Sequence, residues 1–104
     1  MPFNPLDGPA TQFTISATTS SVSEVKDGSN DALKGRQVVT IMPLDGKIWV
    51  YFGNGNTTPS AADVKNKGFP HFKNSMRSYE AAHLQPLYIV SDTGTVDVRI
   101  SERS

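Results

Sequence analysis

The chain has 104 residues with ten basic and ten acidic side chains, so its formal net charge is zero, and it contains no cysteine. This length suits one domain with a single hydrophobic core, and the lack of cysteine excludes disulfides, thiolate metal sites and cysteine nucleophiles. A neutral chain whose apolar runs are all much shorter than the roughly 20 residues of a membrane span is not expected to bind nucleic acid or to enter a membrane.

Residues 1–10 are predicted to form an extended N-terminal arm. Three prolines and a glycine exclude a helix there and favour a polyproline-like backbone. The segment also lacks the basic and apolar regions of a signal peptide, so we expect synthesis in a cytoplasm. Phe3 and Leu6 are the apolar side chains of this arm, and they predict docking on the same domain or on a neighbouring chain, whereas the alternative is a frayed terminus.

Residues 11–19 alternate between apolar and small polar side chains, which predicts a half-buried first strand. Phe13, Ile15 and Ala17 would face the core. Residues 20–25 either continue this strand or begin a second one. The polar and glycine-containing stretch that follows has the composition of a loop.

The most apolar stretch of the chain, residues 47–53, predicts a central strand. Its side chains are bulky on both faces, so both faces need cover and the fold needs two packed layers. A second β-rich run, residues 37–42, precedes it, and the Pro-Leu-Asp-Gly sequence between the two has turn chemistry. We therefore predict a hairpin at the centre of the fold, with Trp49 buried in its core.

Residues 53–74 are predicted to form a long loop that is broken only by one helical turn at 61–64, with Thr58 as its cap. Irregular segments of this length are usually functional, so a partner surface is predicted here, although a plain crossover between two sheets would have the same composition. The candidate partner-binding residues are Asn54, Asn56, Lys65, Lys67, Phe69, His71 and Phe72, together with Phe3 and Leu6 of the arm.

The second half of the chain predicts further strands. Residues 75–81 alternate weakly and are assigned to a strand, with a short helix from Ser78 as the alternative. Residues 87–90 and 95–102 flank a turn and predict a second hairpin, whose last strand directs Val96, Val98 and Ile100 inward. With about seven short strands, residues 11–104 are expected to be one all-β domain, an antiparallel sandwich or jelly-roll-like barrel.

Catalytic chemistry is not expected from this sequence. His71 and His83 are the only histidines, and their spacing fits no metal-binding motif, so neither a metal nor another cofactor is predicted. His71 is interpreted as a contact residue or, alternatively, as a partly exposed loop histidine. The carboxylates are scattered, and no pair is placed as glycoside hydrolysis requires.

The aromatic side chains of the central strand offer an alternative function. Trp49 and Tyr51 would share one face of a sheet and could form a platform on which sugars stack, as in carbohydrate-binding modules. Core packing is the competing interpretation of the same two residues.

Three segments resemble small virion proteins of tailed bacteriophages of the decoration or cement type. These segments are the opening Met-Pro-Phe-Asn-Pro-Leu, the central Lys-Ile-Trp-Val-Tyr-Phe-Gly-Asn-Gly and the final Pro-Leu-Tyr-Ile-Val-Ser-Asp-Thr-Gly-Thr-Val-Asp-Val-Arg-Ile. The similarity extends from Met1 to about Ile100 and concerns the character of the segments and their order along the chain; no segment is a diagnostic motif. The basic segment 65–73 departs from it because it is longer and more charged than a minimal sandwich needs.

The resemblance implies a structural protein without enzymatic activity, built as a β-sandwich or jelly roll. It would bind the major capsid protein or another virion protein on the outside of a phage head, as a dimer or trimer, after synthesis in the host cytoplasm. A head-completion or tail component of the same virion is the nearest alternative, and a carbohydrate-binding β-sandwich module is the alternative from another class.

Overall fold

The computed structural model describes residues 10–28, 30–82 and 84–104, which form eight strands and one short helix. The elements are β1 Ala10–Ala17, β2 Ser23–Glu24, β3 Val38–Pro43, β4 Ile48–Phe52, α1 Ala61–Lys67, β5 Phe69–His71, β6 Arg77–Glu80, β7 Leu87–Ser91 and β8 Val96–Arg103. The predicted arm, including Phe3 and Leu6, lies outside the described residues except for Ala10, where β1 begins.

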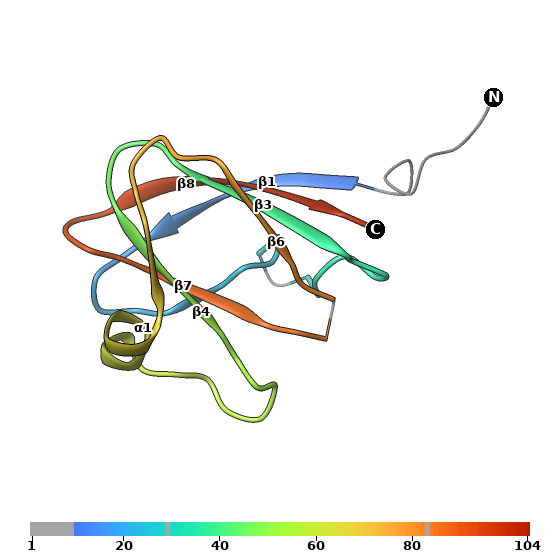
Figure 1. The fold of residues 1–104 in the computed structure, drawn as a ribbon, viewed down its shortest axis with the longest axis horizontal. Helices are drawn as coiled ribbons and strands as arrows, with labels where there is room; N and C mark the ends of the chain where they lie inside the picture. The colour runs from blue at the N-terminus through green and yellow to red at the C-terminus, as the bar shows by residue number, and fades with distance from the viewer. Residues whose placement is uncertain (1–9, 29, 83) are drawn as a thin grey trace.

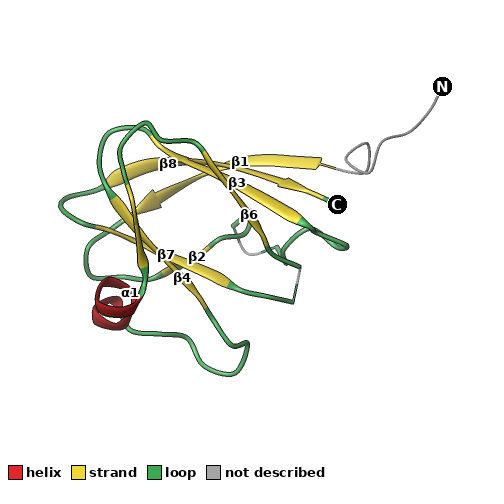
Figure 2. Ribbon diagram, viewed as in Figure 1, coloured by secondary structure: helices red, strands yellow, loops and turns green. Residues whose placement is uncertain are grey.

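The strands form two four-stranded antiparallel sheets that pack face to face (Figures 1 and 2). Sheet A has the order β1-β8-β3-β6 and sheet B the order β2-β7-β4-β5. This interleaving of early and late strands is the topology of a jelly roll. The predicted all-β antiparallel sandwich is therefore confirmed, with eight strands in place of about seven.

The main core lies between the two sheets and follows from the alternation of side chains along the strands. In β3, β4 and β8 buried side chains alternate with more exposed ones, and most of the buried ones are apolar, such as Val39, Ile48 and Val98. Val96, Val98 and Ile100 face inward as predicted. Phe13 and Ile15 of β1 also face this core, but they are only partly buried because β1 is an edge strand.

Both predicted hairpins are wrong. β3 belongs to sheet A and β4 to sheet B, and β7 and β8 are divided between the sheets in the same way. Each pair is an arch that crosses the sandwich. β3 pairs with β8 and β4 pairs with β7, so the partners come from the other arch.

The two arches stack at one end of the sandwich. The Leu44 N–H donates to the Asp97 carbonyl at 2.9 Å, and the Asp92 N–H donates to the Lys47 carbonyl at 2.9 Å. A Cβ on Gly46 would lie 2.6 Å from a methyl group of Val96, so glycine allows the two corners to meet. The turn-forming residues in both segments therefore form corners between the two sheets and not hairpins within one sheet.

Helix α1 covers the outer face of sheet B and completes a second, smaller cluster. Val64 of the helix packs with Tyr88 and Val90 of β7, and Trp49 and Tyr51 are partly buried against them. Cover on both faces of β4 was expected from its sequence and is present. Because Trp49 lies on this outer face, it is half-buried, which corrects the prediction of a buried core tryptophan.

The segment between β4 and β6 is more regular than predicted. The helix runs to Lys67, and its cap is Ser60 instead of Thr58: the Ser60 hydroxyl accepts from the Asp63 N–H at 3.1 Å in a capping box. Residues 69–71, assigned to the loop, form the edge strand β5.

A buried ion pair fixes the end of the sandwich opposite the stacked arches. Arg36 and Glu102 lie 2.8 Å apart and are 2 % and 1 % exposed. The guanidinium also donates to the carbonyls of Ala81, Ala82, Gln85 and Val25. The Glu102 carboxylate accepts from the Thr11 hydroxyl and the Leu33 N–H. These contacts satisfy both charges and join β8 to β1 and to the β2–β3 and β6–β7 connections.

Candidate functional site

The side of the molecule formed by β5, the β5–β6 connection and β6, here called the β5–β6 side, carries most of the exposed large apolar side chains. Phe69 is 58 % exposed, Phe72 59 % and Met76 70 %, and the neighbouring Phe52 at the end of β4 is 38 % exposed. β5 and β6 are the free edges of the two sheets on this side. Phe52 and Phe69 are in contact with each other, and exposed apolar groups that lie together are typical of an interaction surface.

Three aromatic rings join the two sheet edges on this side. The Phe52 ring lies 6.4 Å from the Phe69 ring and 5.8 Å from the Tyr79 ring, both in edge-to-face geometry. Phe52 and Phe69 belong to sheet B and Tyr79 to sheet A. The contacts therefore close the open margin of the sandwich and hold the exposed rings in fixed positions.

His71 supports this arrangement from inside the fold. Its side chain is buried, its Nδ1 accepts from the Tyr79 hydroxyl at 2.9 Å, and its Nε2–H donates to the Ser75 carbonyl. The carbonyl can only accept, so Nε2 carries a proton, and in the neutral ring Nδ1 is then the acceptor for the Tyr79 hydroxyl. Burial lowers the pKa of His71 below its usual 6.5.

His71 is therefore not a contact residue, and its expected place in an exposed loop is wrong. It faces inward because it pairs with Ile48 of β4, whose side chain is buried in the core, and paired residues of neighbouring strands point to the same face. Phe72, on the other hand, is 59 % exposed, so its side chain is accessible to a partner. Of the candidates in the predicted loop, Phe69 lies on the edge strand β5 and Phe72 directly follows that strand.

The other sequence candidates lie elsewhere. Asn54 and Asn56 are exposed in the loop between β4 and α1, where the Asn54 side-chain oxygen accepts from the Asn56 N–H at 2.9 Å and shapes a local turn. Lys65 and Lys67 occupy the last turn of α1, where positive charge complements the helix dipole. These four residues have local structural roles, and nothing in their geometry adds them to the β5–β6 side.

Trp49 makes contacts that bear on the sugar-binding alternative. The Lys47 ammonium lies 4.4 Å from the centroid of the Trp49 ring and 5.4 Å from that of Phe72. The indole N–H donates to the Asp92 carboxylate at 3.0 Å. Because a cation already lies over the ring, the structure does not present Trp49 as a free stacking platform.

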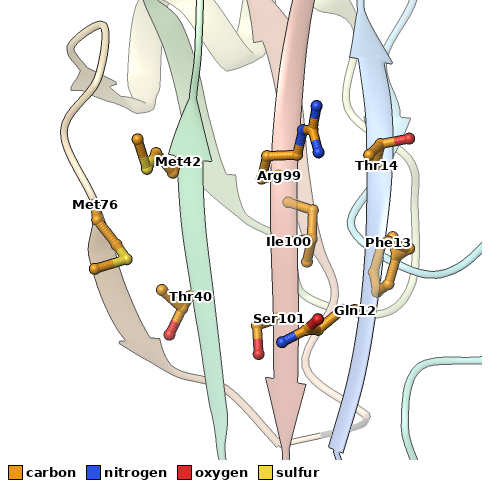
Figure 3. Close-up of a pocket in the computed structure, with 9 residues that line it drawn as sticks. All are labelled: Gln12, Phe13, Thr14, Thr40, Met42, Met76, Arg99, Ile100 and Ser101. Carbon is orange, nitrogen blue, oxygen red and sulfur yellow. The ribbon is translucent and has the colours of Figure 1, made fainter.

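A shallow hollow of 390 Å³ lies on the outer face of sheet A (Figure 3). Its lining combines hydroxyl and amide groups with two methionines and one charged residue, Arg99. Met42 and Met76 lie towards the β6 edge, and Gln12 and Thr14 belong to β1 at the opposite edge. The sequence analysis did not identify this surface, because residues from three strands form it only after the sheet has assembled.

Comparison of the chain with protein-family models, curated proteins and solved structures finds no match. Within the described ranges, no group of three or more His, Asp or Glu side chains could hold a metal ion. Across those same residues, no helix is long and apolar enough to span a bilayer.

Proposed function

We propose that this protein is a non-enzymatic binding protein that attaches to a protein surface through its β5–β6 side. The observation that carries the proposal is the exposure of Phe69 and Phe72 on either side of the buried His71. Aromatic side chains of this kind dominate the energetics of protein interfaces. Each would bury a large apolar area on contact with a complementary surface.

Rigidity supports this assignment of the surface. Phe69 is held by its contact with Phe52, and the connection after β5 is held by hydrogen bonds from Asn74 to Pro43 and from Ser75 to Phe72. A surface that is ordered before binding loses less conformational entropy when a partner docks. The β5–β6 side is thus suited to a specific protein partner.

We further propose that the partner is a phage capsid and that the protein decorates the outside of the head. The similarity of the three segments to decoration proteins supports this choice, and so does the jelly-roll topology, which recurs in viral capsid domains. The second argument is an analogy of fold, because one fold hosts many functions. On a repeated shell, modest contacts per copy would be strengthened by multivalency.

A particle-binding experiment tests the proposal. Purified phage particles are analysed on a gel for this protein, and its copy number is compared with that of the major capsid protein. Copies comparable in number to the capsid subunits support decoration. A few copies per particle would favour the head-completion or tail alternative, and absence from the particles would overturn the virion assignment.

Variants then test the surface itself. The double substitution Phe69→Ser with Phe72→Ser should abolish binding to particles, since it removes the two exposed rings. Leu84→Ser is the matched control, because Leu84 is 80 % exposed but belongs to the connection before β7. Both proteins should keep the melting temperature of the parent within a few degrees. Normal binding by the folded double variant would show that another surface is used.

A further inference from the structure

The four free sheet edges of this sandwich are not equally protected against strand addition. β2 has two residues, β5 has three and includes Pro70, and β6 has four and carries Arg77 and Glu80. Shortness, proline and charge are the usual devices that prevent an edge from pairing with another chain. β1 has none of them.

Among the described strands, β1 is the longest free edge. All of its eight residues, Ala-Thr-Gln-Phe-Thr-Ile-Ser-Ala, are uncharged, and none is proline. It pairs with β8 residue for residue from Ala10 to Ala17, so no bulge twists it away. On the side away from β8, alternate N–H and C=O groups point outward, and no backbone partner for them is found among the described residues.

Side chains beside this edge are also incompletely covered. Phe13 and Ile15 face the core between the sheets but remain only partly buried. The strand of sheet B on the same side, β2, is too short to cover them. Figure 3 shows β1 at the margin of sheet A, with Gln12 and Thr14 on the outer face. A further strand along β1 would cover both the backbone groups and these apolar side chains.

We propose that β1 pairs with β1 of a second copy of this chain, antiparallel and about a twofold axis, so that the two A sheets become one continuous sheet. The axis passes between Thr14 and Thr14 of the second copy. Phe13 then lies opposite Ile15 of the second copy, and residues 11–17 of each chain are paired. Thr opposite Thr, and an aromatic residue opposite a β-branched one, are both side-chain pairs that antiparallel strands favour.

Two observations favour a second copy over an unrelated strand. The uncharged β1 opposes no like charges when it pairs with itself, and its length is matched residue by residue by an identical strand. The register about Thr14 also keeps Pro9, which has no N–H to donate, outside the paired residues. This inference does not depend on the capsid proposal, because the dimer forms without particles.

Sedimentation of the full chain at increasing concentration tests the dimer. The parent protein should convert from monomer to dimer, and Thr14→Glu should weaken the dimer about a hundredfold, because two carboxylates would face each other across the axis. Within its own chain the new carboxylate would lie opposite Arg99 of β8, so the fold should not be weakened. Ser78→Glu, at the β6 edge of the same sheet, is the matched control and should dimerise like the parent.

A charge-swap mixture tests the register. Thr14→Lys alone should dimerise poorly, but a mixture with Thr14→Glu should form a heterodimer, since opposite charges then meet at the axis. Amide hydrogen exchange should show that the outward-facing amides of β1 become protected as the parent dimerises. A parent that stays monomeric, a folded Thr14→Glu variant that dimerises normally, or protection of β6 in place of β1 would each overturn the proposal. Binding of β1 to a strand of another protein with no self-association would overturn the assignment to a second copy.

Discussion

At the scale of single residues, His71 shows how a polar side chain becomes part of the core. Both ring nitrogens have partners in the folded state, and the bond in which Nδ1 accepts from the Tyr79 hydroxyl needs the neutral ring. Protonation would place a positive charge in a buried site and would remove the acceptor that the Tyr79 hydroxyl uses. His71 is therefore a pH-sensitive element of stability.

The sign of the pH effect follows from the lowered pKa of His71. The unfolded chain binds a proton at His71 near the usual pKa of 6.5, whereas the folded chain does so only at lower pH. Between these two pKa values the unfolded state binds more protons, so the free energy of unfolding falls as the pH falls through this window. Above the window the contribution is fully present, and below it the contribution is lost.

Urea unfolding at a series of pH values checks this expectation. The difference in unfolding free energy between the parent and His71→Gln should shrink as the pH falls from above 6.5 into the acid range. The glutamine amide can still donate to the Ser75 carbonyl but does not titrate. All other titratable groups are the same in both proteins, so the comparison isolates His71. Parallel curves for the two proteins would contradict the assignment.

At the scale of the elements, Gly68 connects α1 to β5 by the closest backbone approach at any glycine in the described chain. A Cβ at this position would lie 2.4 Å from the Val64 carbonyl oxygen and 2.6 Å from the Val50 carbonyl oxygen. Both obstacles are backbone atoms, so they cannot move as a flexible side chain would. The helix end and the edge of sheet B meet only because this residue is glycine.

Gly68→Ala should therefore destabilise the protein by about 1 to 3 kcal/mol, the usual range for a forced overlap in a packed site. Gly94→Ala is the comparison: its φ is 61°, but no atom lies within 4 Å of the added Cβ. That substitution should cost only about 1 kcal/mol of backbone strain. Thermal or urea unfolding measures both. Equal losses would mean that the collision at Gly68 is relieved by a small shift.

The elements also show what could be predicted from the sequence. Strands were found where apolar and polar residues alternate, as in residues 11–19 and 95–102, because burial of one face produces that period. Pairing was not predictable from the turns. A Pro-Leu-Asp-Gly turn allows a reversal within a sheet and a corner between sheets equally well, and the choice depends on β8, which is distant in the sequence.

The same limit applies to the candidate site. The position of Phe69 and Phe72 in a long irregular segment marks them as candidate contact residues. Strand β5 is not predictable from the sequence, because it has only three residues and one of them is Pro70. His71 was misplaced for this reason. Glu102 carried a usable signal: the alternation that directs Val96, Val98 and Ile100 inward also directs Glu102 inward, and a buried carboxylate requires a cationic partner.

At the scale of the whole molecule, the Arg36–Glu102 pair holds one end of the sandwich together. The guanidinium binds carbonyls of the β2–β3 and β6–β7 connections, and the carboxylate binds β1 and the β2–β3 connection. Each charge has full compensation only while the other is present. Loss of one partner would leave the other charge buried without its partner.

A double-mutant cycle measures this dependence. Arg36→Met and Glu102→Leu should each destabilise the protein by about 3 to 5 kcal/mol, whereas the double variant should lose much less than the sum of the two. The unfolding free energy of all four proteins gives the coupling. Additive losses would show that the carbonyl and hydroxyl contacts, and not the ion pair, fix this end of the molecule.

Because β1 pairs with β8, sheet A can be completed only late in the synthesis of this domain. During synthesis β1 leaves the ribosome before the other described strands, whereas its partner among them, residues 96–103, is the last of these strands to be made. Sheet A cannot close until β8 has been synthesised, because β8 lies between β1 and β3. The nascent chain therefore carries β1 unpaired until residues 96–103 have left the ribosome, and an unpaired strand of this kind is prone to aggregate.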